Sequence, residues 1–138
     1  MKYELRVVSV ERSLFEGEVE FIIANGADGE LGVLARHAPL IATLKAGSTR
    51  VHLGEGVDRV QEYATGPGFF KVEEDRAIAL VDDAIPASEI DDARAREQLE
   101  TAQRELELVD RGESNADRWQ LEQRIKHAEN QLSVSGRT

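Results

Sequence analysis

The hydrophobic pattern of this chain changes from a strand period to a helix period after Asp83. Before that point, Leu5, Val7 and Ser9 alternate with their neighbours, and four further β-rich runs follow. These runs are residues 19–24, 50–53, 69–72 and 77–81, and turn-forming clusters lie between them at 25–29, 45–48, 54–56 and 73–75. Short β-rich runs at near-regular intervals predict an antiparallel sandwich or barrel. The runs flanking Gly54-Glu55-Gly56 predict a hairpin with a glycine at positive φ.

After Asp83 the apolar residues recur at helical spacing. One stripe comprises Ala95, Leu99, Ala102, Leu106 and Val109, and a second comprises Leu121, Ile125, Ala128 and Leu132. Ser88 is the expected N-cap of the first helix, and Gly112 is the expected residue after its C-cap. Two narrow stripes joined by a short loop predict an antiparallel helical hairpin that buries little apolar surface. We therefore expect a marginally stable hairpin that can leave the surface on which it rests.

The sequence thus predicts an α+β protein, with an N-terminal antiparallel β-sandwich over residues 1–85 and a C-terminal antiparallel helical hairpin over residues 86–138. The net charge of −10 argues against nucleic acid as a partner. Without cysteine, neither disulfides nor thiolate metal sites can form. No apolar run approaches the ~20 residues that span a bilayer, and no secretory signal is visible, so we expect a soluble, cytosolic chain without direct membrane insertion.

Enzyme chemistry has little support in the residues. The three histidines, His37, His52 and His127, are scattered, so a jelly-roll enzyme with a metal in the sandwich is disfavoured. No arrangement of serine or cysteine with histidine supports nucleophilic catalysis either. We therefore predict no catalytic residues and no metal ligands.

The most specific motif covers residues 29–40, which read Gly-Glu-Leu-Gly-Val-Leu-Ala-Arg-His-Ala-Pro-Leu. Glycines permit a sharp turn, and Pro39 restricts the residue before it. We read the segment as a turn, a short apolar stretch and a second, stiff turn that together make a protruding loop. Gly32 is expected to have a conformation that a Cβ atom would strain.

This segment resembles the G-[EQ]-L-G-[IV]-L-x-x-H-A-P-L signature of the epsilon subunit of rotary ATP synthases. Three other segments are similar to the same family. Residues 66–69 (Gly-Pro-Gly-Phe) correspond to its Gly-Gly-Phe, with Pro67 as a departure. Residues 90–95 match [IL]-D-x-x-R-A, and residues 131–134 (Gln-Leu-Ser-Val) look like the family's C-terminal end. The resemblance therefore extends over the whole chain.

The resemblance implies a non-catalytic rotor subunit of the central stalk of a bacterial F-type ATP synthase, coupling proton-driven rotation to ATP synthesis. Its implied partners are the gamma subunit, the ring of c subunits and the catalytic alpha and beta subunits. Its implied location is peripheral, on the cytoplasmic face of the cell membrane. The hairpin would inhibit ATP hydrolysis when extended toward the catalytic subunits. The alternative is a free-standing ATP-sensing module, which would not copurify with a gamma-like chain.

By the same resemblance, the rotor interface comprises Glu30, Leu31, Gly32, His37 and Pro39. Both flanking turns would make this loop protrude from a rigid scaffold, where binding residues tend to lie. The alternative for His37 is a turn histidine whose hydrogen bonds are satisfied locally.

In some bacterial members of the family, ATP binds the folded hairpin, which makes Ile90, Asp91, Arg94 and Ala95 candidate nucleotide-binding residues. The alternative to nucleotide binding is a surface ion pair between Asp91 and Arg94, because the two residues lie one helical turn apart. The chain departs from the ATP-binding pattern in having Ile85 where an acid is usual. Residues 99–101 offer no base where one is usual, although Arg104 could substitute. We therefore expect that no cofactor is required and that ATP is at most a weak regulatory ligand.

On the second helix, Arg118, Arg124 and Lys126 are candidates to meet acidic side chains of the catalytic subunits. The alternative is a solvated helix face with pairs such as Glu122 and Lys126. Trp119 is expected to pack, pinning the hairpin loop to the first helix.

Overall fold

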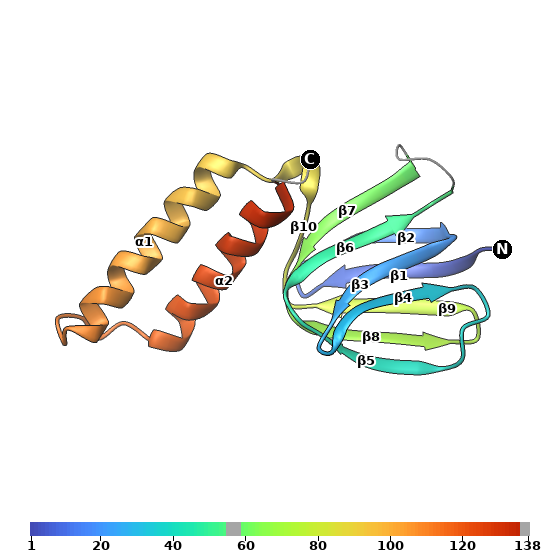
Figure 1. Cartoon of the computed structure of the whole chain (residues 1–138), viewed down its shortest axis with the longest axis horizontal. Helices are drawn as coiled ribbons and strands as arrows, with labels where there is room; N and C mark the ends of the chain where they lie inside the picture. The colour runs from blue at the N-terminus through green and yellow to red at the C-terminus, as the bar shows by residue number, and fades with distance from the viewer. Residues whose placement is uncertain (55–58, 136–138) are drawn as a thin grey trace. The chain divides into compact units, whose positions relative to one another are not determined.

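The computed structural model describes residues 1–54 and 59–135 of the chain. The chain divides into a β unit, Met1–Ala87, and a helical unit from Ser88 onward, each described here by itself (Figure 1). The first contains all ten strands of the described residues and the second both α-helices, so the α+β class is confirmed. Among the described residues, no helix has the length and apolarity needed to cross a membrane.

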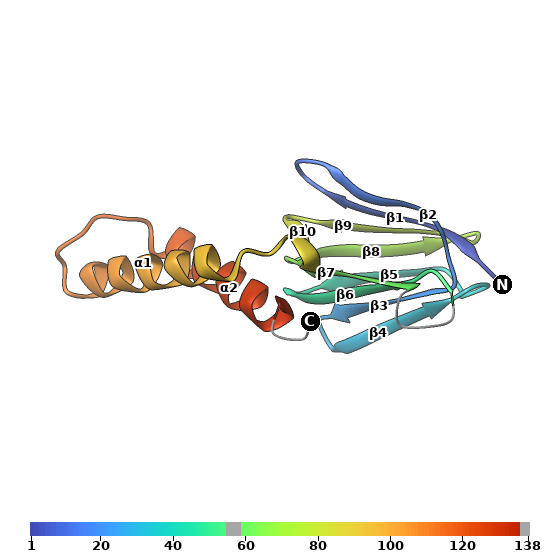
Figure 2. The ribbon, with the colours of Figure 1, turned by 90° about the horizontal axis from the view of Figure 1, so that it is seen from above.

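The ten strands form one continuous sheet that folds into two layers. The strands are β1 Tyr3–Ser9, β2 Ser13–Val19, β3 Phe21–Gly26, β4 Gly29–Leu34, β5 Leu40–Leu44, β6 Gly47–His52, β7 Val60–Thr65, β8 Gly68–Glu73, β9 Arg76–Val81 and β10 Ala84–Pro86. One layer runs β10-β7-β6-β3-β4 and the other β5-β8-β9-β1-β2, joined by a single β3–β5 pairing between Gly26 and Leu44. Figure 2 shows β1 and β2 on one side of the unit and β3 and β4 on the other. The pairing of β1 with β9 is parallel, an exception to the expected antiparallel pattern.

The core lies between the layers and follows the alternation in the sequence. Tyr3, Leu5 and Val7 of β1 are buried, as are Phe70 and Val72 of β8. Residues 19–24, expected as one strand, are divided at Glu20. Val19 ends β2 in one layer and Phe21 begins β3 in the other, so the chain crosses between layers there. The β6–β7 hairpin is confirmed; residues 55 and 56 of its expected Gly-Glu-Gly turn lie outside the described residues.

The motif at residues 29–40 folds as an edge strand between two turns. The first turn is Ala27-Asp28, and Gly29 follows it with φ +128°. The second turn contains Arg36 at φ 63°. Gly32 lies inside β4, paired with Ile23, and a Cβ atom built on it meets no atom within 4 Å. The expectation that Gly32 needs a strained conformation is therefore wrong: the positive φ belongs to Gly29.

The hairpin between β8 and β9 turns through two non-glycine residues with left-handed backbone. Glu74 has φ 50° and Asp75 has φ 59°. The Asp75 conformation is supported on both sides, because its carboxylate Oδ1 accepts the Arg36 N–H at 2.9 Å and its carbonyl accepts the Glu4 N–H at 3.1 Å. The Glu74 side chain makes no hydrogen bond or ion pair among the described residues. The backbone strain of its left-handed conformation is therefore not offset by a local contact.

Replacing Glu74 by glycine should stabilise the β unit. A non-glycine residue in this conformation costs about 1–2 kcal/mol, whereas the added flexibility of glycine in the unfolded chain costs about 0.5–1 kcal/mol. We expect a net gain of about 0.5–1 kcal/mol in the free energy of unfolding, measured by urea denaturation of the full chain. Glu73→Gly, which places glycine at the last residue of β8 and removes the partner of Lys71, is the control and should destabilise. A loss of stability in Glu74→Gly would show that the turn is not strained.

The helical unit is an antiparallel hairpin, as expected. Helix α1 spans Asp92–Asp110 and α2 spans Arg118–Ser135. Ser135 near the end of α2 donates a hydrogen bond to Asp92 at the start of α1, and Arg118 at the start of α2 binds Asp110 at the end of α1. The two contacts hold opposite ends of the helices together.

Of the two predicted cap positions of α1, the C-terminal one is confirmed and the N-terminal one is wrong. Ser88 is not the N-cap, because Ala87–Glu89 form a separate 3-10 turn, η2. Asp91 caps the helix instead, its Oδ1 accepting the Arg94 N–H at 3.1 Å. Gly112 follows the C-cap at φ 74°, as expected, and its N–H bonds to the Val109 carbonyl at 3.1 Å.

The predicted stripes do face the partner helix, but three of the five fully buried residues are alanines. In this unit the buried side chains are Ala95, Ala102, Leu121, Ala128 and Val134, while the larger stripe residues are only partly covered. Burial of an alanine contributes far less than the ~1.5–3 kcal/mol of a leucine or phenylalanine. The apolar contact within the hairpin is therefore modest.

Candidate functional site

The residues predicted to share one loop lie at the two ends of strand β4. Glu30 pairs with Asn25 beside the Ala27-Asp28 turn, whereas Leu34 pairs with Phe21 at the other end. A strand rises about 3.3 Å per residue, so Glu30 and Leu34 are about 13 Å apart, and His37 and Pro39 lie beyond Leu34. The expectation of a single protruding loop is wrong; the segment is a strand edge with a turn at each end.

Glu30, Leu31 and Gly32 have different surroundings. The Glu30 carboxylate pairs with Arg50 at 3.2 Å across the sheet, and its side chain remains 65% exposed. Leu31 packs partly against the core, and Gly32 is exposed. Glu30 and the open backbone at Gly32 are thus accessible to a partner, while Leu31 also serves the fold.

The turn after β4 is braced by the other layer. The Arg36 N–H bond to Asp75 ties this turn to the β8–β9 hairpin. His37 and Pro39 are both exposed, and the Nδ1 atom of His37 lies 2.7 Å from the Ala38 carbonyl. That contact is the locally satisfied arrangement given above as the alternative for His37, and it leaves the rest of the ring exposed.

The sequence reasoning missed an apolar face on the outer side of the β5-β8-β9-β1 layer. Ile41, Phe69 and Leu80 are 71%, 58% and 46% exposed. Phe69 pairs in register with Leu80, and Leu80 pairs with Val8. The side chains of Phe69, Leu80 and Val8 therefore form a row across the strands. We call Val8, Ile41, Phe69, Ile78 and Leu80 the apolar face.

The signal for this face was present in β9. Its buried positions hold the smaller residues Ala77, Ala79 and Val81, while Ile78 and Leu80 point outward. A strand that places its largest apolar side chains on the solvent side indicates a surface that another molecule covers.

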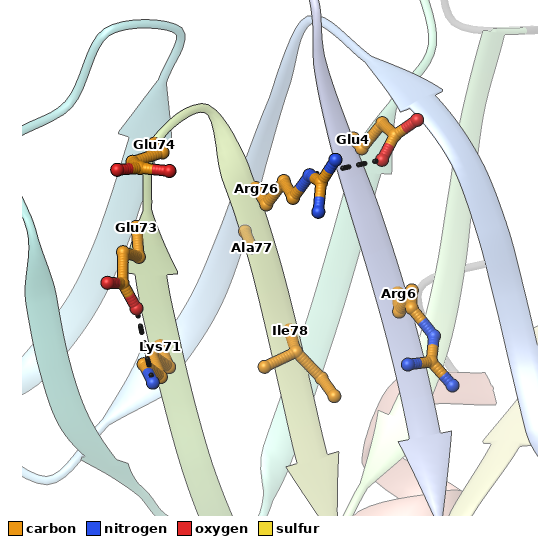
Figure 3. Close-up of a pocket in the computed structure, with 8 residues that line it drawn as sticks. All are labelled: Glu4, Arg6, Lys71, Glu73, Glu74, Arg76, Ala77 and Ile78. Atoms are coloured by element: carbon orange, nitrogen blue, oxygen red, sulfur yellow. Dashed lines mark ion pairs between the residues drawn. The ribbon is translucent and has the colours of Figure 1, made fainter.

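An open hollow of about 410 Å³ lies next to the apolar face (Figure 3). It is lined by Glu4, Arg6, Lys71, Glu73, Glu74, Arg76, Ala77 and Ile78. Lys71 pairs with Glu73 at 3.3 Å, and Arg76 pairs with Glu4 at 3.8 Å. In register, Ile78 lies between Lys71 on β8 and Arg6 on β1. The hollow thus has an apolar floor between two cationic side chains.

The outer side of the opposite layer holds an aromatic stack. The rings of Phe21 and His52 are 3.9 Å apart between centroids and nearly parallel. Burial lowers the pKa of His52, nearby Arg50 lowers it further, and Glu20 acts in the opposite direction. The lowered pKa favours the neutral form of His52.

Most of the candidate nucleotide-binding residues have structural roles in the helical unit. Asp91 caps α1 through the backbone of Arg94, and Ala95 is 1% exposed within the helical unit. Ile90 is half-buried, and only the Arg94 side chain of the four is both charged and free to reach outward. The structure brings Asp91 and Arg94 together through the cap.

The three basic residues of α2 do not form one patch. Arg118 binds Asp110 and lies 3.9 Å from Glu122. Arg124 and Lys126 are exposed, but two residues on a helix are about 200° apart, so they project to nearly opposite sides. Trp119 is 66% exposed, so the expectation that it packs against the first helix is wrong. Among the described residues, no group of histidine, aspartate and glutamate is arranged to hold a metal ion.

Comparison with known proteins adds to this geometry. Residues 2–87 match the family model described as the β-sandwich domain of the ATP synthase delta/epsilon chain. The chain is 36% identical to the ATP synthase epsilon chain of Rubrobacter xylanophilus, over 96% of this chain and 90% of that one. It is 35% identical to the epsilon chain of Halalkalibacterium halodurans, over 96% of both.

A solved structure shares the fold. The mitochondrial ATP synthase of Euglena gracilis, in a structure of OSCP, F1 and the c-ring, contains a chain that superimposes with a TM-score of 0.74 at 23% identity. The match covers 96% of this chain and 81% of that chain. From the family model and the sequence relatives, the chain belongs to the ATP synthase epsilon-chain family.

Proposed function

We propose that this chain is a non-catalytic rotor subunit, held peripherally at the cytoplasmic face of the cell membrane within an ATP synthase. It would couple proton-driven rotation to ATP synthesis by joining the gamma subunit to the ring of c subunits. The support is the family membership together with two accessible surfaces on the β unit, the apolar face and the exposed edge of β4.

The observation that carries this proposal is the apolar face. Docking of the gamma subunit on Ile41, Phe69 and Leu80 would remove their exposed carbons from water, at about 25 cal/mol per Å². Rows of large apolar side chains on a sheet exterior otherwise favour aggregation. We assign the β4 edge, with Glu30 at one end and His37 and Pro39 at the other, to the c ring.

A paired substitution tests the docking face. Phe69→Ser combined with Leu80→Ser should weaken capture of the stalk complex about tenfold or more, because each loses an apolar contact in the covered centre. The two side chains are 58% and 46% exposed, so the thermal midpoint of the free protein should change little. The measurement is affinity for a complex reconstituted without this subunit.

Trp119→Ser is the matched control, because it removes an exposed apolar side chain from the helical unit. It should leave capture within about twofold of the native protein. Equal weakening by Trp119→Ser and by the paired substitution would contradict the assignment of the docking face.

We further propose that the hairpin inhibits ATP hydrolysis by reaching the catalytic alpha and beta subunits. On α2, Arg124 and Lys126 are exposed cations on opposite sides of the helix, each available to a different acidic surface, and Arg118 would first have to leave Asp110. ATP would act as a weak ligand at most. Asp91 already serves as the cap, and its charge and that of Asp92 oppose phosphate at the start of α1.

A further inference from the structure

In the hollow beside the apolar face, one cation, Arg6, and one carboxylate, Glu74, make no ion pair among the described residues. Lys71 and Arg76 each have a carboxylate partner, Glu73 and Glu4 respectively. No ion pair or hydrogen bond between described residues involves the Arg6 side chain, although Glu16 lies opposite it on β2. Figure 3 shows Arg6 on one side of Ile78, apart from both paired groups.

The position of Arg6 makes it part of the same surface as the apolar face. On β1, Arg6 and Val8 project to the same side, and in register Arg6 is next to Ile78 just as Val8 is next to Leu80. A molecule that covers Leu80 and Val8 and extends one row further along these strands also covers Arg6 and Ile78. Covering them would remove water from Arg6, and an unpaired guanidinium in that setting is costly.

We propose that the hollow receives an acidic side chain of the stalk subunit that docks on the apolar face. Its carboxylate binds the Arg6 guanidinium, and its methylene groups lie on Ile78. This inference rests on the proposed docking function and names the chemistry of the partner at one point of the surface.

The chemistry of arginine explains why a carboxylate fits. The guanidinium offers a planar fork of N–H donors that binds a carboxylate with two parallel hydrogen bonds. Such a pair strengthens as the surrounding apolar side chains exclude water. A basic side chain lying on Ile78 would stand between Arg6 and Lys71, so charge disfavours it at that point, although Glu4, Glu73 and Glu74 line the rest of the hollow.

The test compares three single variants of the full chain, Arg6→Glu, Arg6→Lys and Lys45→Glu, binding to a stalk complex that lacks this subunit. Hydrogen bonds to charged groups correspond to about ten- to a hundredfold in affinity, so Arg6→Glu should bind that much more weakly. Arg6→Lys keeps the charge without the fork and should lose less. Lys45→Glu makes the same charge change at an exposed site between β5 and β6, and should bind like the native protein.

The outcomes separate this inference from the docking function. If Arg6→Glu binds like the native protein while the paired Phe69 and Leu80 substitution fails to bind, the acidic side chain is excluded and the docking face stands. If both bind normally, the docking face is itself wrong. If Arg6→Glu and Lys45→Glu weaken binding equally, the effect is one of overall charge and the hollow has no specific occupant.

Discussion

Replacing Gly68 by alanine should lower the stability of the β unit more than any exposed substitution considered above. A Cβ atom at this position would lie 2.0 Å from the Leu80 carbonyl oxygen and 2.7 Å from the Val81 Cα. Both atoms belong to the backbone of β9, which pairs with β8 at this residue, so neither can move without shifting the strand. We expect a loss of about 3 kcal/mol, the upper end of the usual cost of overpacking, and a fall in melting temperature of more than ~10 °C.

Gly32→Ala is the matched control for Gly68→Ala. It adds the same methyl group to a strand glycine whose surroundings are empty to 4 Å. Because glycine inside a strand costs about 0.5–1 kcal/mol relative to alanine, this variant should be slightly more stable than the native protein. Thermal and urea denaturation of the two full-length variants give the comparison. A similar loss in both would mean that the close approach at Gly68 is not what limits the substitution.

Removing residues 88–138 should raise ATP hydrolysis by the assembled complex and leave the subunit bound. The truncation must keep Ala84–Pro86, because β10 pairs with β7 and Ala84 belongs to the core. A cut after residue 85, at the boundary expected from the sequence, would sever that strand. If the extended hairpin is favoured by about 1.4 kcal/mol, roughly nine tenths of the complexes are blocked, and truncation raises the rate about tenfold.

Arg124→Gln together with Lys126→Gln should reproduce part of that increase, and Arg96→Gln on α1 is the control. The measurement is the steady-state hydrolysis rate, with the amount of bound subunit determined in the same samples. Equal rates with and without the hairpin would exclude the inhibitory role. The subunit would then serve coupling alone.

The sequence predicted the class of each part because both depend on short-range periodicity. The alternation at Leu5 and Val7 predicts a half-buried strand, and the stripe from Leu121 to Leu132 predicts one helix face. Neither prediction depends on contacts with distant parts of the chain. The Schellman-type end of α1 at Gly112 could also be predicted, because it depends only on neighbouring residues. The parallel pairing of β1 with β9 could not be predicted in this way, since it joins segments far apart in the chain.

The candidate site was predicted less well for a related reason. The motif around Glu30 and His37 was recognised, but a run of letters does not show whether it is a loop or a strand, and the answer depends on the pairing of β4 with β3. Phe69 and Leu80 were placed in β-rich runs, but hydrophobicity alone does not say which face of a layer is inside. The small residues Ala77 and Ala79 at the buried positions of β9 carried that information.

The parallel pairing of β1 and β9 also constrains the order in which the protein can fold. Its first paired residues, Glu4 and Arg76, are 72 positions apart, and β1 otherwise has only the edge strand β2 as a neighbour. Contacts of such long sequence separation form slowly. During synthesis the β1–β2 hairpin must therefore wait, with Leu5 and Val7 uncovered, until the ribosome has released β9.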